Sequence, residues 1–274
     1  MQIRTAVADD LDAIVDIASM VDPPADDAEV DASYYRYLLE HGHFVVAEAS
    51  DIVVGYAAVV DVDATLHVSD LFLHQDARGQ GIGRRLLDAV WHTNSASAPR
   101  QTFSSLHSAA LPLYVRAGMV PMWPLLYLNG SSGALPASPL EVRTIAGEAA
   151  AALEAEWLTW DRDADYGYWA KRPGARIFAV RDGGSTLAVG VTVRNRAMHT
   201  LSRFACVDGS VMPEAASAAA RWCGDDVMVA VPGTNRAVPM LMEAGWRVVE
   251  HRLYCASEPG LMDPERLLPH PGLL

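Results

Sequence analysis

Two stretches of the sequence combine residue types and spacings that could do chemistry. The first ends an apolar run with Leu71-Phe72-Leu73 and continues as Arg78-Gly79-Gln80-Gly81-Ile82-Gly83-Arg84, followed by apolar residues at helical spacing. Glycines at a helix N-terminus leave backbone N–H groups open to a phosphate or pyrophosphate. The second stretch, residues 107–119, carries Tyr114, a phenol that stays protonated at neutral pH and can act as an acid. A phosphate-bearing cofactor is therefore expected.

The spacing excludes two common phosphate sites. A dinucleotide fingerprint requires glycine at its first, third and sixth positions, and counting from Gly79 the sixth position is Arg84. A P-loop requires Gly-Lys-Ser or Gly-Lys-Thr, and neither triplet occurs in the chain.

The first stretch resembles a known family motif. The pattern Arg-x-x-Gly-x-Gly, formed by Arg78, Gly81 and Gly83 after an apolar strand, resembles the acetyl-CoA-binding motif of the GCN5-related N-acetyltransferases (GNAT). The resemblance implies that the amides of residues 78–84 hold the CoA pyrophosphate. It also implies that the strand end at residues 71–73 binds the pantetheine arm and the acyl carbonyl. A tight strand-to-helix connection without a ligand is the alternative.

The second stretch resembles the same family's C-terminal motif, Ala-x-x-Leu-Tyr-x-x-x-Gly. Ala110, Leu113, Tyr114 and Gly118 fall on the matching positions. By this resemblance Tyr114 would protonate the leaving CoA thiolate, although it could also be a core aromatic residue. His107 stands where the family commonly has an asparagine, so its cofactor contact is less well supported.

Transfer to an amine also needs a base, because most primary amines are protonated at pH 7. Related enzymes often place a glutamate on the strand before the pyrophosphate turn. Regular alternation puts His67, Ser69 and Leu71 on that face, and none of them is glutamate. His67 is the preferred candidate because imidazole has a pKa of about 6.5. Asp70 is the second candidate and is expected to face the other way, and a histidine without a catalytic role is the alternative.

The elements that must position these groups follow the family order. Strands are expected at residues 2–5, 44–49, 52–60, 65–73, 101–104 and 119–128. Helices are expected up to about residue 20, at residues 32–40 and 81–93, and around Tyr114. Residues 129–136 read as a linker because Gly, Ser and Pro dominate them. The expected fold is α/β (α+β), with a mixed, mainly antiparallel sheet flanked by helices.

The second half of the chain repeats the first. Ala110-Leu111-Pro112 and Ala117-Gly118 recur as Ala237-Val238-Pro239 and Ala244-Gly245 at identical spacing. The resemblance therefore predicts two tandem GNAT folds, a catalytic domain at residues 1–130 and a degenerate domain at residues 137–274. Leu241 replaces Tyr114 in the second copy, and no Arg-x-x-Gly-x-Gly occurs there. The second domain is expected to bind no CoA and to buttress the first or wall the acceptor site.

Composition narrows the class of protein. The 274 residues carry a net charge of −13, which argues against nucleic-acid binding. No apolar stretch approaches a membrane span, and the start lacks a signal-peptide pattern, so a cytoplasmic protein is expected. Three widely spaced cysteines offer neither a disulfide framework nor a metal site.

Three features have two interpretations each. Acidic residues crowd the region before the second expected helix and would attract a cationic amine, or they form a solvated loop. They are Asp22, Asp26, Asp27, Glu29 and Asp31. An aromatic cluster could wall the acceptor or form the core between helices or domains. It comprises Trp157, Trp160, Tyr166, Tyr168 and Trp169. The final twelve residues are expected to pack on a surface as a tail.

The predicted function is transfer of an acetyl group from acetyl-CoA to a small amine. An acyltransferase with another donor or acceptor, or an acyl-CoA decarboxylase, is the first alternative. A CoA-binding sensor without turnover is the second, although a sensor would have no use for Tyr114 as an acid. The acceptor's identity and the oligomeric state do not follow from the sequence.

Overall fold

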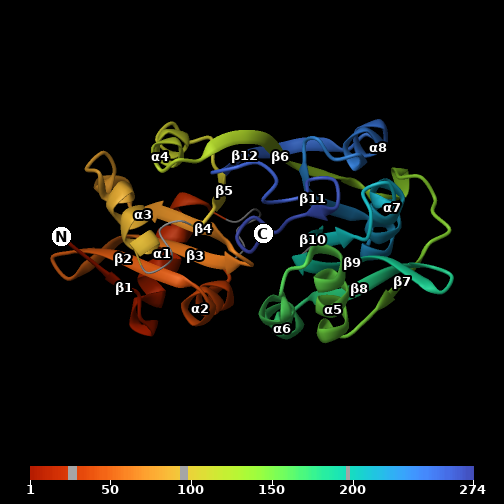
Figure 1. Cartoon of the computed structure of the whole chain (residues 1–274), viewed down its shortest axis with the longest axis horizontal. Helices are drawn as coiled ribbons and strands as arrows, with labels where there is room; N and C mark the ends of the chain where they lie inside the picture. Colours follow the sequence, from red (N-terminus) through yellow and green to blue (C-terminus); the bar gives the residue numbers. More distant parts are fainter. Residues whose placement is uncertain (24–29, 93–97, 196–197) are drawn as a thin grey trace.

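Two similar halves lie side by side in the computed structural model, which describes residues 1–23, 30–92, 98–195 and 198–274 (Figure 1). Each half has a twisted sheet with helices on both faces, and the C-terminus lies between the halves. In the described part of the chain, the strands join in one mixed sheet in the order β1-β2-β3-β4-β5-β12-β6-β11-β10-β9-β8-β7, with β13 paired to β10. Most neighbouring strands are antiparallel, as the sequence predicted.

The halves repeat one order of elements. The first contains β1 (Gln2–Thr5), α1 (Leu11–Val21), α2 (Ala32–His41), β2 (His43–Ala49), β3 (Ile52–Val62), β4 (Thr65–Leu73), α3 (Ile82–His92), β5 (Arg100–Ser104), α4 (Ala110–Arg116) and β6 (Val120–Ser131). The second contains β7 (Glu141–Thr144), α5 (Gly147–Leu158), α6 (Asp163–Lys171), β8 (Ala175–Asp182), β9 (Ser185–Asn195), β10 (Met198–Cys206), α7 (Met212–Cys223), β11 (Asp226–Pro232), α8 (Ala237–Glu243), β12 (Arg247–Ala256) and the short β13 (Leu267–Leu268). The tandem fold predicted from the repeat is confirmed.

Local sequence explains how the helices pack. The α1 residues Ile14, Ile17 and Ala18 recur at helical spacing and are buried against the sheet. Asp31 caps α2, because its carboxylate accepts a hydrogen bond of 2.9 Å from the Ser33 backbone N–H. This cap fixes where α2 starts, and α2 carries side chains that reach the other half.

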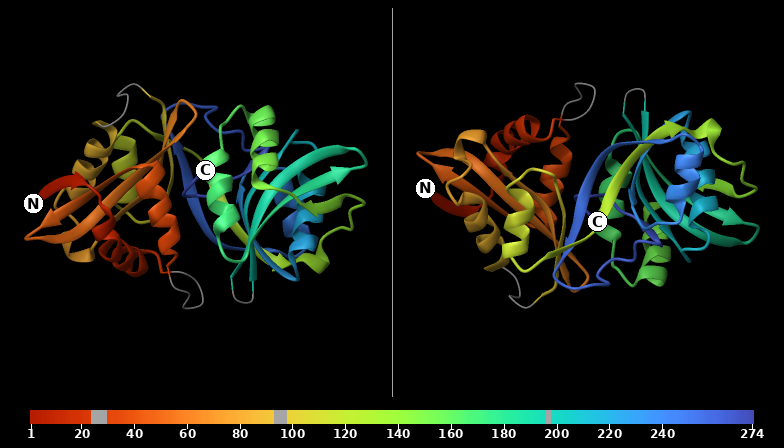
Figure 2. Two further views of the ribbon diagram at one scale, coloured as in Figure 1. Left: turned by 90° about the horizontal axis from the view of Figure 1, so that it is seen from below. Right: turned by 90° about the horizontal axis from the view of Figure 1, so that it is seen from above.

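The last strand of each half is exchanged with the other half. β12 pairs antiparallel with β5, so the second half's final strand completes the first half's sheet. β6 pairs antiparallel with β11 and extends the second half's sheet. β6 and β12 also pair with each other and bridge the halves, as Figure 2 shows. The predicted linker at residues 129–136 is therefore wrong at its start, because residues 129–131 lie in β6 and pair with β11.

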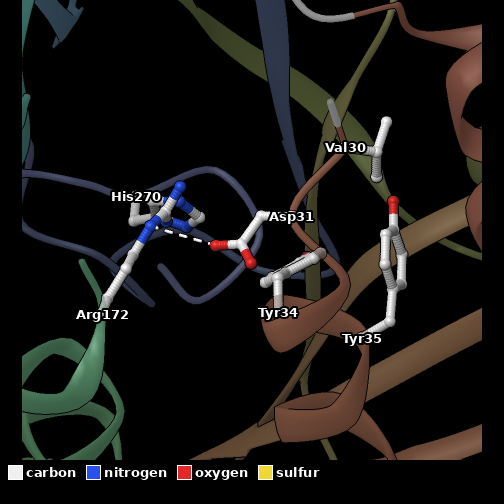
Figure 3. A pocket seen from close by; sticks show the side chains of 6 residues that line it. All are labelled: Val30, Asp31, Tyr34, Tyr35, Arg172 and His270. Atoms are coloured by element: carbon white, nitrogen blue, oxygen red, sulfur yellow. Dashed lines mark ion pairs between the residues drawn. The ribbon is translucent and has the colours of Figure 1, made fainter. Parts of the chain in front are cut away.

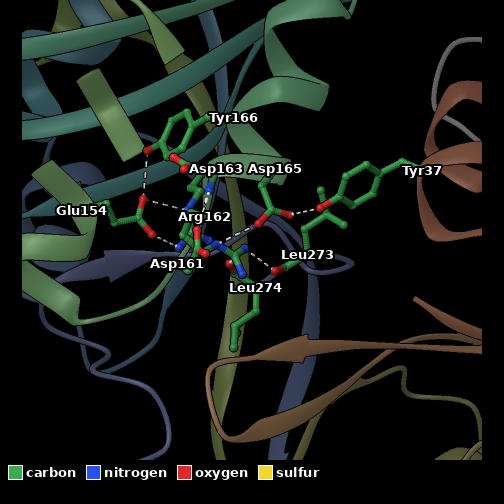
Figure 4. Close-up of polar contacts among 10 residues, drawn as sticks. Tyr37, Glu154, Asp161, Arg162, Asp163, Asp165, Tyr166, Leu273 and Leu274 are labelled. Carbon is green, nitrogen blue, oxygen red and sulfur yellow. Dashed lines mark hydrogen bonds and ion pairs between the residues drawn. The ribbon is translucent and has the colours of Figure 1, made fainter. Parts of the chain in front are cut away.

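Buried polar contacts also join the halves (Figure 4). Tyr37 of α2 donates a hydrogen bond of 2.8 Å to Asp165 of α6. Asp165 pairs with Arg162 at 3.1 Å, and the Arg162 guanidinium donates to the carbonyl of Leu274 at 2.8 Å. The interface is thus a charged network that fixes α2, α6 and the end of the chain together.

The aromatic cluster predicted from the sequence is part of the core between the halves. It therefore follows the interpretation as a core between helices or domains. The Tyr168 ring lies 5.0 Å from the ring of Tyr37 in the first half. The Trp169 ring is buried and lies 5.1 Å from the ring of His270. Trp157 and Trp160 are only half-buried at its edge.

The final segment does not pack on an outer surface, so this prediction is wrong. β13 pairs with β10, and Leu273 and Leu274 are buried between the halves. Apolar side chains and two carbonyls that accept from Arg162 explain why the segment is drawn inside. No helix within the described ranges is long and apolar enough to cross a membrane.

Candidate acyl-transfer site

The turn between β4 and α3 has the geometry of an anion-binding site. Gly79 and Gly81 adopt φ angles of +77° and +75°, which residues with a Cβ rarely tolerate. A Cβ built at either glycine would meet no atom within 4 Å, so the space beside the backbone is free for a ligand. α3 begins directly afterwards at Ile82, and its first-turn amides carry the positive end of the helix dipole. These features fit the pyrophosphate of CoA.

The turn's polar side chains lie on the surface. Arg78 and Arg84 are exposed, and the Arg78 guanidinium donates to the carbonyl of Leu73 at 3.3 Å. Gln80 donates from its side-chain amide to the carbonyl of Asp76 at 3.0 Å, which closes the turn. Two cations beside open amides would strengthen the attraction for a diphosphate.

Ile82 and Gly83 have a packing role. Ile82 is buried in the core between the sheet and α3. A Cβ at Gly83 would lie 3.6 Å from side-chain atoms of Leu71, Leu73 and Leu113. Gly83 therefore lets the start of α3 lie close to the end of β4.

β4 and β5 separate below this turn. They pair in parallel over only three residues, with Leu66–Val68 opposite Arg100–Thr102. β4 continues to Leu73, held on its other edge by β3. Parallel strands that separate expose backbone N–H and C=O groups along the gap. Such groups could bind the amides of a pantetheine arm, as expected for residues 71–73.

The three residues that end β4 point to alternate faces. Leu71 and Leu73 lie on the α3 face with Ile82. Phe72 lies on the α1 face, where its ring is 5.7 Å from that of Tyr56. Their side chains are thus used for packing, and only their backbone is available to a ligand.

Tyr114 lies in α4 where β4 and β5 separate. It is 7% exposed, and its pKa is raised above the ordinary value mainly by burial, although the Thr102 side chain opposes this. The Thr102 hydroxyl donates 3.0 Å to the carbonyl of Val68, the last paired residue of β4. A raised pKa keeps the phenol protonated, as a general acid requires.

His107 is exposed at the start of α4. Its Nδ1 accepts from the Ala109 backbone N–H at 3.2 Å, and its carbonyl accepts from Ala110 at 2.9 Å. These bonds organise the turn into α4, and the cofactor contact predicted for His107 stays a prediction.

The strand parity predicted for Asp70 is wrong. Val68 lies opposite Val59 of β3 and Asp70 lies opposite Ala58, so Ser69 is an extra residue, a β-bulge. Because the bulge resets the alternation, Asp70 shares the α1 face with His67, which lies opposite Val60.

Asp70 is a half-buried residue with a buried carboxylate oxygen and an unusual pKa. Burial raises the pKa of Asp70 to about 7, and the charges of Asp22 and Arg252 act on it in opposite directions. Its Oδ2 has no hydrogen-bond partner among the described residues. A carboxylate that is half-ionised near neutral pH is well matched to proton removal from an amine.

His67 lies deeper in the protein. It is fully buried, and its Nε2 donates 2.8 Å to the carbonyl of Pro271 in the final segment. Burial lowers the pKa of His67 to about 4. The imidazole is held neutral by packing and is a weak base.

The second half adds side chains that the sequence did not indicate. Arg252 of β12 acts electrostatically on both Asp70 and Tyr114. Its guanidinium lies 2.9 Å from Asp22 at the end of α1 and 3.0 Å from Glu250. Because β12 enters the first half by strand exchange, no local sequence signal could have placed Arg252 there. The adjacent Tyr34 and Tyr35 in an expected helix were a signal that could have been followed.

The comparisons with known proteins agree with this geometry. Residues 25–133 match the family described as an acetyltransferase (GNAT) domain. No curated protein matches the sequence.

Solved structures share the fold over almost the whole chain. A proposed acetyltransferase from Pyrococcus horikoshii is 14% identical, with a TM-score of 0.75, and the match covers 100% of this chain and 93% of that one. A tandem GNAT protein from the clavulanic acid biosynthesis pathway is 16% identical, with a TM-score of 0.63 and coverage of 96% and 99%. A GCN5-related N-acetyltransferase from Anabaena variabilis is 11% identical, with a TM-score of 0.64 and coverage of 93% and 72%.

The matched residues contain both the glycine turn and Tyr114, while the structural matches extend through both halves. Residues 25–133 thus match the acetyltransferase (GNAT) domain, and the chain as a whole has the fold of tandem GNAT proteins.

Proposed function

We propose that the protein transfers the acetyl group of acetyl-CoA to the amine of a small molecule. The observation that carries this proposal is the juxtaposition of three features in the first half. They are the open glycine turn, the gap between β4 and β5, and the half-buried Asp70 on the strand that borders the gap.

In the proposed reaction Asp70 is the base, in place of His67. The Asp70 carboxylate accepts a proton from the ammonium group, and the neutral amine attacks the thioester carbonyl. His67 is unsuited because its Nε2 proton is committed to Pro271 and its pKa is about 4. Bringing amine and thioester together supplies much of the acceleration, up to roughly 7–11 kcal/mol in well-aligned cases.

Tyr114 then acts as the acid. As the C–S bond breaks, the phenol donates its proton to the CoA thiolate, and the second proton lost by the nitrogen leaves with solvent. Solvent then takes the proton from Asp70 and returns one to Tyr114, so that one proton is released in each turnover. The products are an N-acetyl amine and CoA. Burial of Tyr114 in α4 supports this role because it keeps the hydroxyl protonated until the thiolate forms.

The division of labour between the halves is part of the same proposal. The domain at residues 1–130 binds acetyl-CoA, and the domain at residues 137–274 binds none and completes the acceptor side. The three cysteines are all free and buried, which supports a cytoplasmic location.

Isothermal titration with acetyl-, malonyl- and succinyl-CoA, followed by thiol-release assays on a panel of amines, tests the proposal. We expect one acetyl-CoA site per chain and thiol release that depends on an amine. Two sites would contradict the silent second half. Binding without turnover on any amine would favour a sensor, and preference for another donor would change the assigned acyl group.

A further inference from the structure

A cavity lies between the two halves, lined by residues from both of them (Figure 3). Its volume is about 180 Å³, and its lining comes from α2 and the two residues before it, from the residue after α6 and from the final segment: Val30, Asp31, Tyr34, Tyr35, Arg172 and His270. A second cavity of about 200 Å³ shares Arg172 and His270 with the first. We call the two together the chamber.

The chamber reaches the proposed base through two tyrosines. Tyr34 and Tyr35 line the first cavity, and the negative charge of Asp70 acts on both phenols. Tyr34 is close enough to Asp70 to lower its pKa, and it packs against Gly272 of the final segment. Asp70 itself lines neither cavity, so an amine held against these rings would interact with its carboxylate through the two phenols.

The other end of the chamber has an apolar floor with polar side chains beside it. The floor is the sheet of the second half, with Val193 from β9, Leu201 from β10, and Met228 and Ala230 from β11, and Asn195, Thr200 and Ser202 line the same cavity. Tyr127 of β6 borders the same cavity. This floor suits the carbon skeleton of an amine.

Near the chamber, one carboxylate of the described residues, that of Asp70, is not in an ion pair with an arginine. Arg172 pairs with Asp31 at 3.0 Å, and this pair is drawn in Figure 3. Arg252 pairs with Asp22 at 2.9 Å. In contrast, Asp70 Oδ2 has no hydrogen-bond partner among the described residues. Each nearby arginine is thus already neutralised, and the local excess charge is negative.

This balance favours one class of acceptor. An ammonium group would be stabilised by Asp70 and by the faces of the tyrosine rings. A carboxylate on the same molecule would lose its hydration and find its two candidate partners, Arg172 and Arg252, already paired. The acidic residues Asp26, Asp27 and Glu29 lie outside the described residues and do not enter this argument.

We propose that the chamber is the acceptor site and that it selects small amines lacking an acidic group over the corresponding amino acids. This inference rests on the proposed acetyl transfer and adds to it the chemical class of the acceptor. The Asp31–Arg172 pair is its specificity determinant, because it cancels a cation that would otherwise recognise a carboxylate.

Matched acceptors test the inference on the intact protein. Thiol release from acetyl-CoA is measured with tyramine against tyrosine, phenethylamine against phenylalanine, and agmatine against arginine. We expect kcat/KM to favour each amine by at least about tenfold, which corresponds to roughly 1.4 kcal/mol. Tyrosine methyl ester separates charge from size, and it should react like tyramine.

Two variants move the preference in opposite directions. Asp31→Asn frees Arg172 and should reduce the ratio of tyramine to tyrosine turnover by about tenfold. Arg172→Gln frees Asp31 and should increase that ratio. Glu40→Gln, an exposed carboxylate on the same helix with 72% side-chain exposure, should leave the ratio unchanged.

Failure of this inference can be distinguished from failure of the proposed acetyl transfer. Preference for the amino acids, or a methyl ester that reacts no better than tyrosine, would overturn this inference and leave the acetyltransferase assignment standing. An unchanged ratio in both variants would remove the ion pair as the determinant. Absence of turnover with every amine and amino acid would overturn the proposed function and the inference together.

Discussion

Each half contains one pair of parallel strands that separate, β4 and β5 in the first half and β10 and β11 in the second. The gap between the strands is open in the first half and filled in the second. In both, the strands pair in parallel over three residues, Leu66–Val68 with β5 and His199–Leu201 with β11. Both then carry a one-residue bulge, at Ser69 in β4 and at Ser202 in β10. Asp70 and Arg203 consequently occupy equivalent positions.

The surroundings of these positions differ. Arg203 is paired with the buried Glu154, with Nε to Oε2 at 3.0 Å, whereas Asp70 Oδ2 has no described partner. The gap beside β10 is taken by β13, which pairs with Phe204 and Ala205. At the turn after β10, a Cβ on Gly209 would lie 2.9 Å from Glu265, while the turn after β4 is open. The comparison teaches that a ligand cleft can be closed by the chain itself without a change of fold.

The largest expected effect is on acetyl-CoA binding. Gly81→Val forces a branched side chain into a positive-φ position and into the space proposed for the pyrophosphate, so we expect no detectable binding by calorimetry. Gly183→Val is the control, because Gly183 also has a positive φ and an open Cβ site but lies in the second half. Retained binding in Gly81→Val would refute the assigned cleft.

Asp70→Asn should lower kcat/KM by about 10²- to 10⁴-fold, the usual contribution of a general base. The wild-type protein should lose activity as the pH falls through about 7, since protonation of Asp70 removes the base. This fall in the pH–rate profile should be absent in the Asp70→Asn variant. Asp61→Asn, with a side chain 55% exposed, is the control. An unaltered pH–rate profile would exclude Asp70.

The same substitution should raise stability above pH 7. The pKa of Asp70 is about 7 in the folded state against an ordinary value of 3.8, so its ionised form destabilises the fold fully above pH 7, and this cost declines as the pH falls from about 7 toward 3.8. Arg203, at the position equivalent to Asp70, is paired with Glu154. Glu154→Gln should therefore do the opposite and lower the free energy of unfolding by about 3–5 kcal/mol, because it leaves the buried guanidinium without a charged partner. Denaturant titrations at pH 8 compare the two. If Glu154→Gln were more stable than the wild type, the contrast between the unpaired Asp70 and the paired Arg203 and Glu154 would be wrong.

Tyr114→Phe should lower kcat by roughly tenfold or more and leave the Kd for acetyl-CoA nearly unchanged, because only the acid is lost. The matching change in the second half, Leu241→Tyr, should alter neither quantity, since Leu241 is buried in the core of the second half and away from the glycine turn. Steady-state kinetics with calorimetry provide both numbers. Unchanged turnover in Tyr114→Phe would remove it as the acid.

The smallest effect concerns acid stability. The pKa values of His67 and His270 are lowered by burial to about 4 and about 3. Below about pH 6.5 the unfolded chain binds protons that these buried rings do not, so stability falls progressively toward pH 4. His67→Gln should flatten this fall in a series of thermal melts. His43→Gln, at a half-exposed histidine, is the control.

Contiguous motifs were predictable from the sequence. The glycine turn and the α4 motif each lie within a dozen residues, and their order required no knowledge of distant contacts. The repeat was visible because α4 and α8 keep identical spacing, and Gly118 and Gly245 after them both adopt positive φ.

The acceptor side was not predictable, for three physical reasons. The bulge at Ser69 reverses the face of Asp70, and alternation alone assumes that no residue is extra. The exchange of β6 and β12 brings Arg252 to the site from the far half of the chain. The final segment lies between the halves because the buried Arg162 donates a hydrogen bond to the carbonyl of Leu274. A hydropathy pattern does not show that an arginine is buried.

The strand exchange has a consequence for the order of events during synthesis. β5 pairs with β12, and the Tyr254 hydroxyl donates to Gln101 across 153 residues of sequence. The first half thus cannot acquire its last sheet neighbour until nearly the whole polypeptide has left the ribosome. Contacts this distant in sequence slow folding, because a long loop must close before they form. The nascent first half would wait with an exposed β5 edge, a target for chaperones that bind unpaired strands.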